Sequence, residues 1–287
     1  MEPLIHPTTK TGLEALTVQK PHAILIEGAE GAGKSTIASY LAAKVLNIEP
    51  SKLANYPYFK QIQPDGSISI ETVRGLHEFA KLRTLGAAQI RRIIIMENAS
   101  QMTREAQNAF LKLLEEPPAD TMIILTVVSA HNLLPTIVSR VTKLPIQKPA
   151  KEVLFNYFKG QGASLTDIER AYALSSGQPS LMASLLDSSS EQPLVKQIQV
   201  AKELLGSTAF VRLTRVDELA KNKQDLPVLT TALKKVVQAA LNAAIDRSKT
   251  DDAKRWTRTL RGLNTKESEL AYSPNIKLWL TDLLISL

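Results

Sequence analysis

The residues from Gly28 to Ser35 have the types and spacing of a phosphate-binding loop, G-x-x-x-x-G-K-S. Glycines allow such a loop to turn its backbone N–H groups toward an anion. Lys34 can reach the β- and γ-phosphates of a nucleotide, and the hydroxyl of Ser35 can bind Mg²⁺. The loop residues predicted to bind nucleotide are Gly28, Gly31, Gly33, Lys34, Ser35 and Thr36. The motif therefore predicts a site for ATP or ADP with Mg²⁺; the alternative is a glycine turn without a ligand.

The elements around this loop match the strand and helix that the motif requires. Residues 22–27 are short and apolar, which is typical of a buried strand, and a helix with apolar residues at helical spacing continues through about Asn47. Two later apolar runs, residues 92–96 and 122–128, also read as buried strands. Because these strands are apolar on both faces and alternate with helices, we expect a parallel sheet covered on both sides.

Shorter elements complete the N-terminal half of the chain. The pattern predicts an edge strand near Tyr58–Ile62, a helix capped by Ser69 that runs through about Thr84, a helix from Thr103 through Glu116 that Pro117 and Pro118 end, a short helix near Leu133–Ser139 and a strand at about Thr142–Ile146.

The domain organisation follows from length and pattern. A chain of 287 residues suits two or three domains. We predict an α/β P-loop domain over residues 1–148, a small helical domain over 149–192 and an all-helical domain over 193–287. A polar linker at Ser188–Pro193 separates the last two.

Composition excludes several kinds of chemistry. The chain has no cysteine, so disulfides, thiolate zinc sites and cysteine nucleophiles are excluded, and its four histidines lack metal-ligand spacing. No apolar run approaches a membrane span, and the N-terminus has no signal-peptide layout. We therefore expect a cytoplasmic protein without a membrane partner. The net charge of +7 is concentrated in the C-terminal third, which could face nucleic acid or be a solvated helical surface.

Three further stretches carry motifs that are specific when they occur in this order along a chain. They are Ile93–Ala99, Gln107–Pro118 and Leu133–Arg140. Together with His22–Lys34 they resemble the AAA+ clamp-loader subunits of bacterial DNA replication, most of all the delta-prime subunits of DNA polymerase III. The resemblance is close over residues 20–145, and the remainder matches only in layout. It implies an AAA+ P-loop domain, a helical lid domain and a helical collar domain that mediates assembly.

The resemblance also implies a function and partners. Such a subunit joins gamma/tau and delta subunits in a heteropentamer that places a sliding clamp on primed DNA, and ATP lies between neighbouring subunits. Ser139-Arg140 resembles the S-R-C motif of the family, with Val141 in place of Cys. Arg140 would then be an arginine finger that acts on the neighbour's ATP site. The alternative is an arginine that binds the last carbonyls of its own helix.

Three elements that support ATP hydrolysis depart from the family pattern. The Asp-Glu pair of AAA+ motors is replaced by Glu97-Asn98; Glu97 could still bind Mg²⁺, but Asn98 is a poor base. Val127 and Val128 stand where the next strand should end in a polar sensor, and Ser180 stands where the lid should carry an arginine. We therefore predict that the chain binds nucleotide with little hydrolysis of its own. The four-cysteine zinc module of many delta-prime subunits is absent, so no zinc is expected.

Other functions stay open. An autonomous P-loop ATPase or a nucleotide kinase is one, although residues 150–195 hold only three basic groups against five acids, too few for a phosphate-clamping lid. A gamma/tau-type motor subunit is another, and Glu97-Asn98 argues against it.

A nucleic-acid-binding module is a further alternative. Lys254, Arg255, Arg258 and Arg261 are spaced to share one helical face beside Trp256. DNA phosphates or a contact between collar domains are the two candidate partners of that face. In the N-terminal half, Arg74 is hypothesised to lie near the path of DNA.

Overall fold

The computed structural model describes all residues from 3 to 287 except 65, 188, 271 and 273. The chain divides into two compact units: residues 1–154 with 178–180, and residues 155–177 with 181–287. Each unit has its own core. The three-domain division expected from the sequence stays a prediction, and Ser188 of the expected linker lies outside the described residues.

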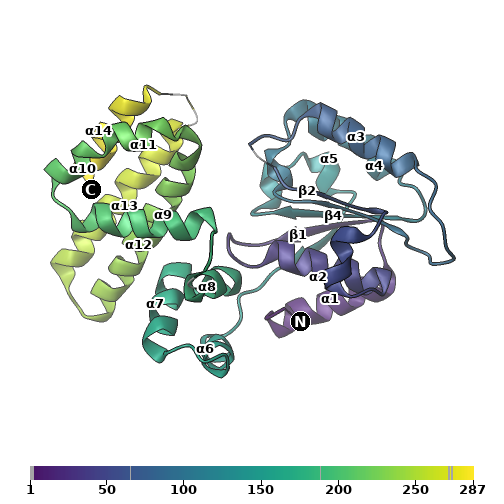
Figure 1. Ribbon diagram of the computed structural model, residues 1–287, viewed down its shortest axis with the longest axis horizontal. Coiled ribbons are helices and arrows are strands. Elements are labelled where there is room, and N and C mark those ends of the chain that lie inside the picture. The colour runs from purple at the N-terminus through teal and green to yellow at the C-terminus, as the bar shows by residue number, and fades with distance from the viewer. Residues whose placement is uncertain (1–2, 65, 188, 271, 273) are drawn as a thin grey trace. The chain divides into compact units, whose positions relative to one another are not determined.

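A parallel sheet of five strands forms the centre of the first unit (Figure 1). Its strands are β1 (Ala23–Glu27), β2 (Phe59–Ile62), β3 (Arg92–Met96), β4 (Thr121–Val127) and β5 (Thr142–Pro145). Their order is β2-β3-β4-β1-β5, and every pair is parallel. β3 and β4 are buried along their whole length, as their apolar sequences predict. The expected parallel sheet is confirmed, and β2 is its expected edge strand.

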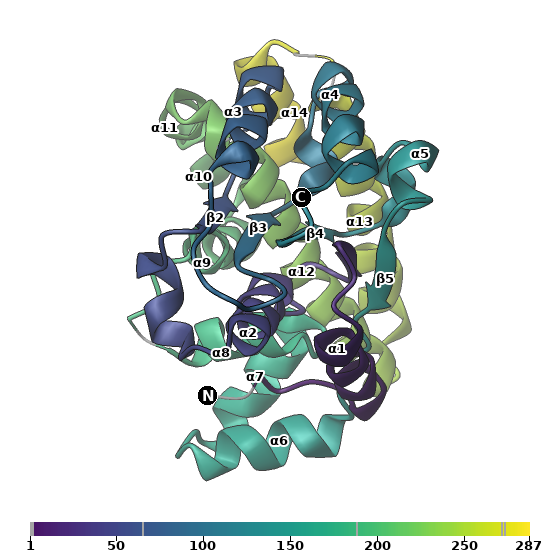
Figure 2. The same cartoon turned by 90° about the vertical axis from the view of Figure 1, so that its right-hand side faces the viewer.

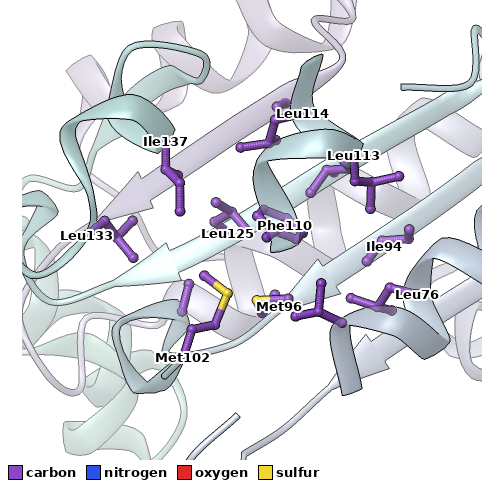
Figure 3. Packing of buried hydrophobic residues seen from close by; sticks show 14 of the residues in the cluster. Leu76, Ile94, Met96, Met102, Phe110, Leu113, Leu114, Leu125, Leu133 and Ile137 are labelled. Atoms are coloured by element: carbon purple, nitrogen blue, oxygen red, sulfur yellow. The ribbon is translucent and has the colours of Figure 1, made fainter. Parts of the chain in front are cut away.

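Helices cover both faces of this sheet (Figure 1 and Figure 2). The helical elements are α1 (Pro7–Gln19), α2 (Lys34–Leu46), η1 (Pro50–Asn55), α3 (Ile70–Lys81), η2 (Ala99–Gln101), α4 (Arg104–Glu115), η3 (Ala130–Asn132) and α5 (Pro135–Val138). On one face α3, α4 and α5 pack a core in which Phe110 lies among Leu76, Met96 and Leu125 (Figure 3). On the other face α1 and α2 pack a second core that includes Leu13 and Leu41.

Helix α1 was not predicted from the sequence. The Nδ1 atom of His6 accepts a hydrogen bond from the backbone N of Thr8, and Pro7 occupies the first turn, so the start is well capped. Only Leu13 and Leu16 give the helix an apolar stripe, and its four threonines have low helix propensity. Burial of the two leucines against the sheet is what stabilises the helix.

Helix α3 ends at Lys81, three residues before the predicted end near Thr84. Its N-cap is the predicted Ser69, whose hydroxyl accepts from the backbone N of Thr72. At the other end the buried side chain of Arg92 donates to the carbonyl oxygens of Ala80 and Leu82. Because this side chain satisfies carbonyls that another helical turn would otherwise use, the chain leaves the helix there.

The second unit is helical throughout its described residues (Figure 1). The helices from residue 151 to the C-terminus, of which α6 and α8 begin with residues of the first unit, are α6 (Lys151–Gly160), α7 (Leu165–Ser175), α8 (Pro179–Leu186), α9 (Pro193–Gly206), α10 (Ala209–Thr214), α11 (Val216–Lys221), η4 (Lys223–Asp225), α12 (Leu226–Asp246), α13 (Thr250–Leu270) and α14 (Ile276–Ser286). Leu174 of α7 packs in the same core as residues of α9, α11, α12, α13 and α14. Among the described helices, none is long and apolar enough to cross a membrane.

Candidate nucleotide-binding site

The phosphate-binding loop joins β1, which lies between β4 and β5, to the first turn of α2. The backbone N of Gly28 donates to the carbonyl of Val127, which anchors the loop to β4. Gly31 and Gly33 have φ values of 80° and 84°, where a side chain would be strained. A Cβ at Gly28 would lie 3.0 Å from the Cβ of Ile146. The loop therefore needs glycine for its conformation and close packing, and its open backbone fits a bound phosphate chain.

Lys34 is 8% exposed and is folded back onto the loop. Its Nζ lies 2.9 Å from the carbonyl oxygens of both Gly28 and Ala29. Burial lowers the pKa of Lys34 below the usual range of lysine, while the charges of Glu30 and Glu97 act in the opposite direction. The ammonium group thus lies at the loop, held by two carbonyls that a phosphate oxygen could replace.

The other two loop residues predicted to bind nucleotide or Mg²⁺ are Ser35 and Thr36. Ser35 is half-buried and Thr36 is exposed in the first turn of α2. Neither hydroxyl makes a hydrogen bond with the described residues, so both can accept a ligand. The positive N-terminal end of α2 adds to the attraction for an anion.

Glu97 follows β3 at the same edge of the sheet, and the structure brings it to the loop. Its Oε1 accepts hydrogen bonds from Nε2 of Gln61 at 2.6 Å and of Gln63 at 3.4 Å. Sequence reasoning missed both glutamines, because only the pairing of β2 with β3 places Gln61 beside the end of β3. Glu97 is thus held by side chains of the neighbouring strand, near enough to Lys34 for their charges to interact.

Asn98 has the left-handed φ of 45°, which Asn tolerates better than most residues. Its backbone N donates to the hydroxyl of Thr126, a buried residue of β4. Thr126 therefore positions the turn after β3. Val128, one of the two residues in the expected sensor position, is 51% exposed and has no polar group to offer a phosphate.

Ser180 belongs to the same compact unit as the loop. Its backbone N donates to the carbonyl oxygen of Gly31 at 3.0 Å. A residue from the predicted lid thus contacts the phosphate-binding loop through its backbone. It brings no positive charge there, because its side chain is a hydroxyl.

Arg140 follows α5, away from the loop of its own chain. Its Nη2 lies 2.8 Å from Oε1 of Glu115, and its Nη1 donates to the carbonyl of Thr136 at 2.9 Å. The second contact is the one expected of an arginine that binds its own helix. The side chain is still 36% exposed. This geometry is therefore compatible with both predicted roles of Arg140, an arginine finger for a neighbouring subunit and an arginine that binds its own helix.

The specific run from Gln107 to Pro118 supports the segment that carries Arg140. Oε1 of Gln107 accepts from the backbone N of Leu134, at the start of α5, and its Nε2 donates to the carbonyl of Met102. Glu115 holds the guanidinium itself. The run therefore orients α5, a relationship between α4 and α5 that sequence spacing does not reveal.

The remaining residues singled out from the sequence lie on surfaces. Arg74 is exposed on α3, next to the carboxylate of Glu71. Lys254, Arg255, Arg258 and Arg261 of α13 are exposed in the second unit. Within the described part of the chain, no group of three or more His, Asp or Glu side chains is placed to hold a metal ion. A Mg²⁺ ion at the loop would therefore depend on Ser35, Glu97 and the nucleotide's own phosphates.

A parallel sheet with a phosphate-binding loop after its inner strand β1, followed by helical segments, defines an AAA+ P-loop protein. A solved structure with this fold is that of a DNA polymerase III gamma subunit-related protein from Thermotoga maritima. It aligns with a TM-score of 0.54 over 95% of this chain and 97% of that chain, at 21% sequence identity. At this level of identity the likeness shows the fold alone.

Sequence comparisons show similarity to subunits of DNA polymerase III. Residues 11–150 match the family described as DNA polymerase III, delta subunit. The DNA polymerase III subunit delta' of Bacillus subtilis is 36% identical over 44% of this chain and 42% of that protein. The subunit delta' of Pseudomonas aeruginosa is 29% identical over 65% of this chain and 62% of that protein. Residues 11–150, about half of the chain, are therefore similar to the delta-prime subunits of DNA polymerase III. The chain spans about two fifths to three fifths of the length of these relatives.

Proposed function

We propose that this chain is a delta-prime-like clamp-loader subunit that binds ATP or ADP with Mg²⁺ but hydrolyses ATP poorly. In the same proposal it supplies Arg140 to the ATP site of a neighbouring subunit and helps to load the sliding clamp on primed DNA. The observation that carries the proposal is a complete phosphate-binding loop next to an altered pair of residues at the end of β3. In this pair, Glu97-Asn98, Asn98 stands where AAA+ motors have a carboxylate that acts as a base.

The residues that would hold the nucleotide are those of the loop and the end of β3. Backbone N–H groups of residues 28–33 would bind the phosphates, and Lys34 would exchange its two carbonyl partners for phosphate oxygens. Ser35 and Glu97 would bind Mg²⁺, which neutralises charge on the β- and γ-phosphates when it is bound. The exchange at Lys34 costs two existing hydrogen bonds, which supports moderate rather than tight affinity.

Weak hydrolysis follows from the groups near the expected position of the γ-phosphate. A water molecule that attacks phosphorus needs a group that orients it or accepts its proton. The side-chain amide of Asn98 accepts no proton near neutral pH, and Val128 offers no hydrogen bond. Glu97 is occupied on one oxygen by Gln61 and Gln63. Bound nucleotide would then act mainly as a structural ligand.

The role of Arg140 in a neighbour's site is supported by its exposure and its partners. An exposed ion pair such as that with Glu115 contributes little to stability. A planar guanidinium binds phosphate oxygens through two parallel hydrogen bonds, which are stronger than ordinary ones. Exchange of Glu115 for a neighbour's γ-phosphate is therefore favourable once subunits assemble.

The partners in this proposal are gamma/tau and delta subunits in a heteropentamer, with the sliding clamp and primed DNA reached through the complex. A cytoplasmic location is part of the same proposal. The alternatives are an autonomous P-loop ATPase and a gamma/tau-type motor subunit.

One pair of measurements separates these functions. The purified chain should bind a fluorescent ADP analogue in the presence of Mg²⁺, yet its steady-state ATP hydrolysis should stay near background. Added gamma/tau and delta subunits should form a complex whose hydrolysis depends on this chain. Rapid turnover by the isolated chain that disappears in Lys34→Ala would refute the non-hydrolysing role and favour an autonomous ATPase.

A further inference from the structure

Helix α13 presents a row of positive side chains on one side. Lys254, Arg255, Arg258 and Arg261 are all exposed, and we call these four residues the basic face. The opposite side of the helix packs into the core of the unit through the buried Leu263 and the half-buried Leu260. The helix is therefore fixed by its apolar side, and the orientation of the basic face follows from that packing.

The charges of the basic face are largely uncompensated. None of the three arginines lies within 4.0 Å of a carboxylate among the described residues, and Lys254 reaches only Asp251, at 4.0 Å. Residues 247–261 carry six basic and two acidic side chains. By contrast, six other cations of this unit are each paired with an acid: Arg170, Lys196, Arg215, Lys234, Lys266 and Lys277.

Such a cluster does not stabilise the helix, since like charges three and four residues apart repel. The basic face also repels a buried arginine of the same unit, Arg212. Burial lowers the pKa of Arg212, and the positive charge of Arg255 lowers this pKa further. A positive surface that weakens its own fold is understandable if a negative partner binds it.

The geometry of the basic face suits a phosphate backbone. Lys254 and Arg261 are about 10 Å apart along the helix at the usual rise per residue. Phosphates of one strand of duplex DNA recur about every 3.4 Å along its axis, so this length spans about three of them. The guanidinium of Arg255 lies 4.8 Å from the ring centre of Trp256, a contact that orients it. Arginine forks bind phosphate oxygens well.

The surroundings argue against a protein partner. The core of a protein interface is usually apolar. Residues 246–270 expose no large hydrophobic side chain, and the nearest ones in the sequence are Ile245 and Tyr272. We infer that the basic face of α13 is a binding surface for the phosphate backbone of duplex DNA. This inference goes beyond the proposed function, because it depends on neither the nucleotide site nor Arg140.

The test compares two triple variants of the full chain that remove equal charge. Arg255→Gln, Arg258→Gln and Arg261→Gln neutralise the basic face. Arg170→Gln, Lys196→Gln and Lys277→Gln neutralise three exposed cations that are paired with acids. Binding of a fluorescent 20-base-pair duplex is followed by anisotropy over a salt series. The first variant should bind at least tenfold more weakly, and the slope of log K against log salt should fall by about 2 to 3.

The control variant should lose less than about threefold in affinity. A third variant with lysine at positions 255, 258 and 261 should keep most of the binding, since it keeps the charge. Equal losses in both triple variants would show that net charge alone is responsible and would overturn the inference. The inference would also be overturned if the first variant kept its DNA affinity but failed to assemble with gamma/tau and delta subunits. That result would assign the basic face to a protein partner. Equal competition by polyglutamate of matched charge would also count against DNA.

Discussion

The side-chain amide of Gln61 donates a 2.6 Å hydrogen bond to the carboxylate of Glu97. The two residues come from neighbouring parallel strands, and their contact fixes the carboxylate beside the phosphate-binding loop. One oxygen of Glu97 is thereby engaged, and the other is available to a metal ion. The acid proposed to bind Mg²⁺ is therefore preorganised by a residue outside the motif.

We predict that Gln61→Ala weakens Mg²⁺-dependent nucleotide binding. Loss of a group that orients a metal ligand typically lowers affinity by about 10- to 100-fold, and because Gln63 still donates to the same oxygen we expect about a tenfold rise in the Kd for ADP with Mg²⁺. Titration with a fluorescent ADP analogue, with Mg²⁺ and with EDTA, measures this. The effect should vanish in EDTA, and Gln63→Ala, which removes the longer 3.4 Å contact, should be milder. An equal effect with and without Mg²⁺ would argue against positioning by Gln61.

Lys34→Ala should weaken nucleotide binding by about 10- to 100-fold, which corresponds to the loss of a hydrogen bond to a charged group. Isothermal titration calorimetry with ADP and Mg²⁺ measures the change. Lys44→Ala, an exposed substitution on the same helix, is the matched control and should leave the Kd unchanged. Equal binding by the Lys34 variant would mean that the loop is a glycine turn without a ligand.

The affinity of the site should also depend on pH. Burial lowers the pKa of Lys34, so its ammonium loses its proton at a lower pH than an ordinary lysine does. Phosphate binds the charged form, and its negative charge raises the pKa of Lys34 in the complex. Affinity should therefore fall as pH rises above the pKa of the free protein, and binding in that range should take up protons. Calorimetry in buffers of different ionisation enthalpy measures the proton uptake; its absence up to about pH 10, near the ordinary lysine pKa, would contradict this.

Arg140→Ala should leave the fold intact and impair the assembled complex. Its ion pair with Glu115 is exposed, so the free energy of unfolding should change by less than about 1 kcal/mol. Removal of an arginine finger costs about 10³-fold or more in turnover at the site it serves. Single-turnover hydrolysis at the neighbouring subunit is the measurement. Glu115→Gln releases Arg140 without removing it and should retain turnover. If both variants lose turnover equally, the ion pair and not the guanidinium matters.

Arg92→Met should destabilise the first unit by about 3 to 5 kcal/mol, because it leaves Asp120 and the end of α3 without a buried partner. Urea unfolding measures this, with Arg83→Met as an exposed control.

Although burial raises the pKa of Asp120, the hydrogen bond from Thr84 and the charges of Arg92 and Arg91 lower it overall. Its contribution is therefore complete above the unfolded pKa of about 3.9 and is lost as pH falls through the folded value. In Asp120→Asn, stability should depend less on pH in that range.

Sequence patterns predicted the sheet, the loop and most helices because strong burial and strong turn signals agree there. They failed for features that tertiary contacts determine. Helix α1 depends on the packing of Leu13 and Leu16, and the end of α3 depends on Arg92. The loop residues proposed to bind nucleotide follow from the motif alone. The supports of the site do not, because Gln61, Thr126 and Glu115 reach it only through strand pairing or helix packing.

Leu174 of α7 lies in one core with residues of α9, α11, α12, α13 and α14. This shared core has a thermodynamic consequence. Helix α7 should unfold together with the C-terminal helices in one cooperative transition. The slowest amide protons of α7 and of the C-terminal helices should therefore exchange with solvent through the same opening event. A fragment beginning at residue 193 would lack Leu174 and leave a cavity at its place, so the cooperative folding unit of this half of the protein begins before the expected lid–collar boundary.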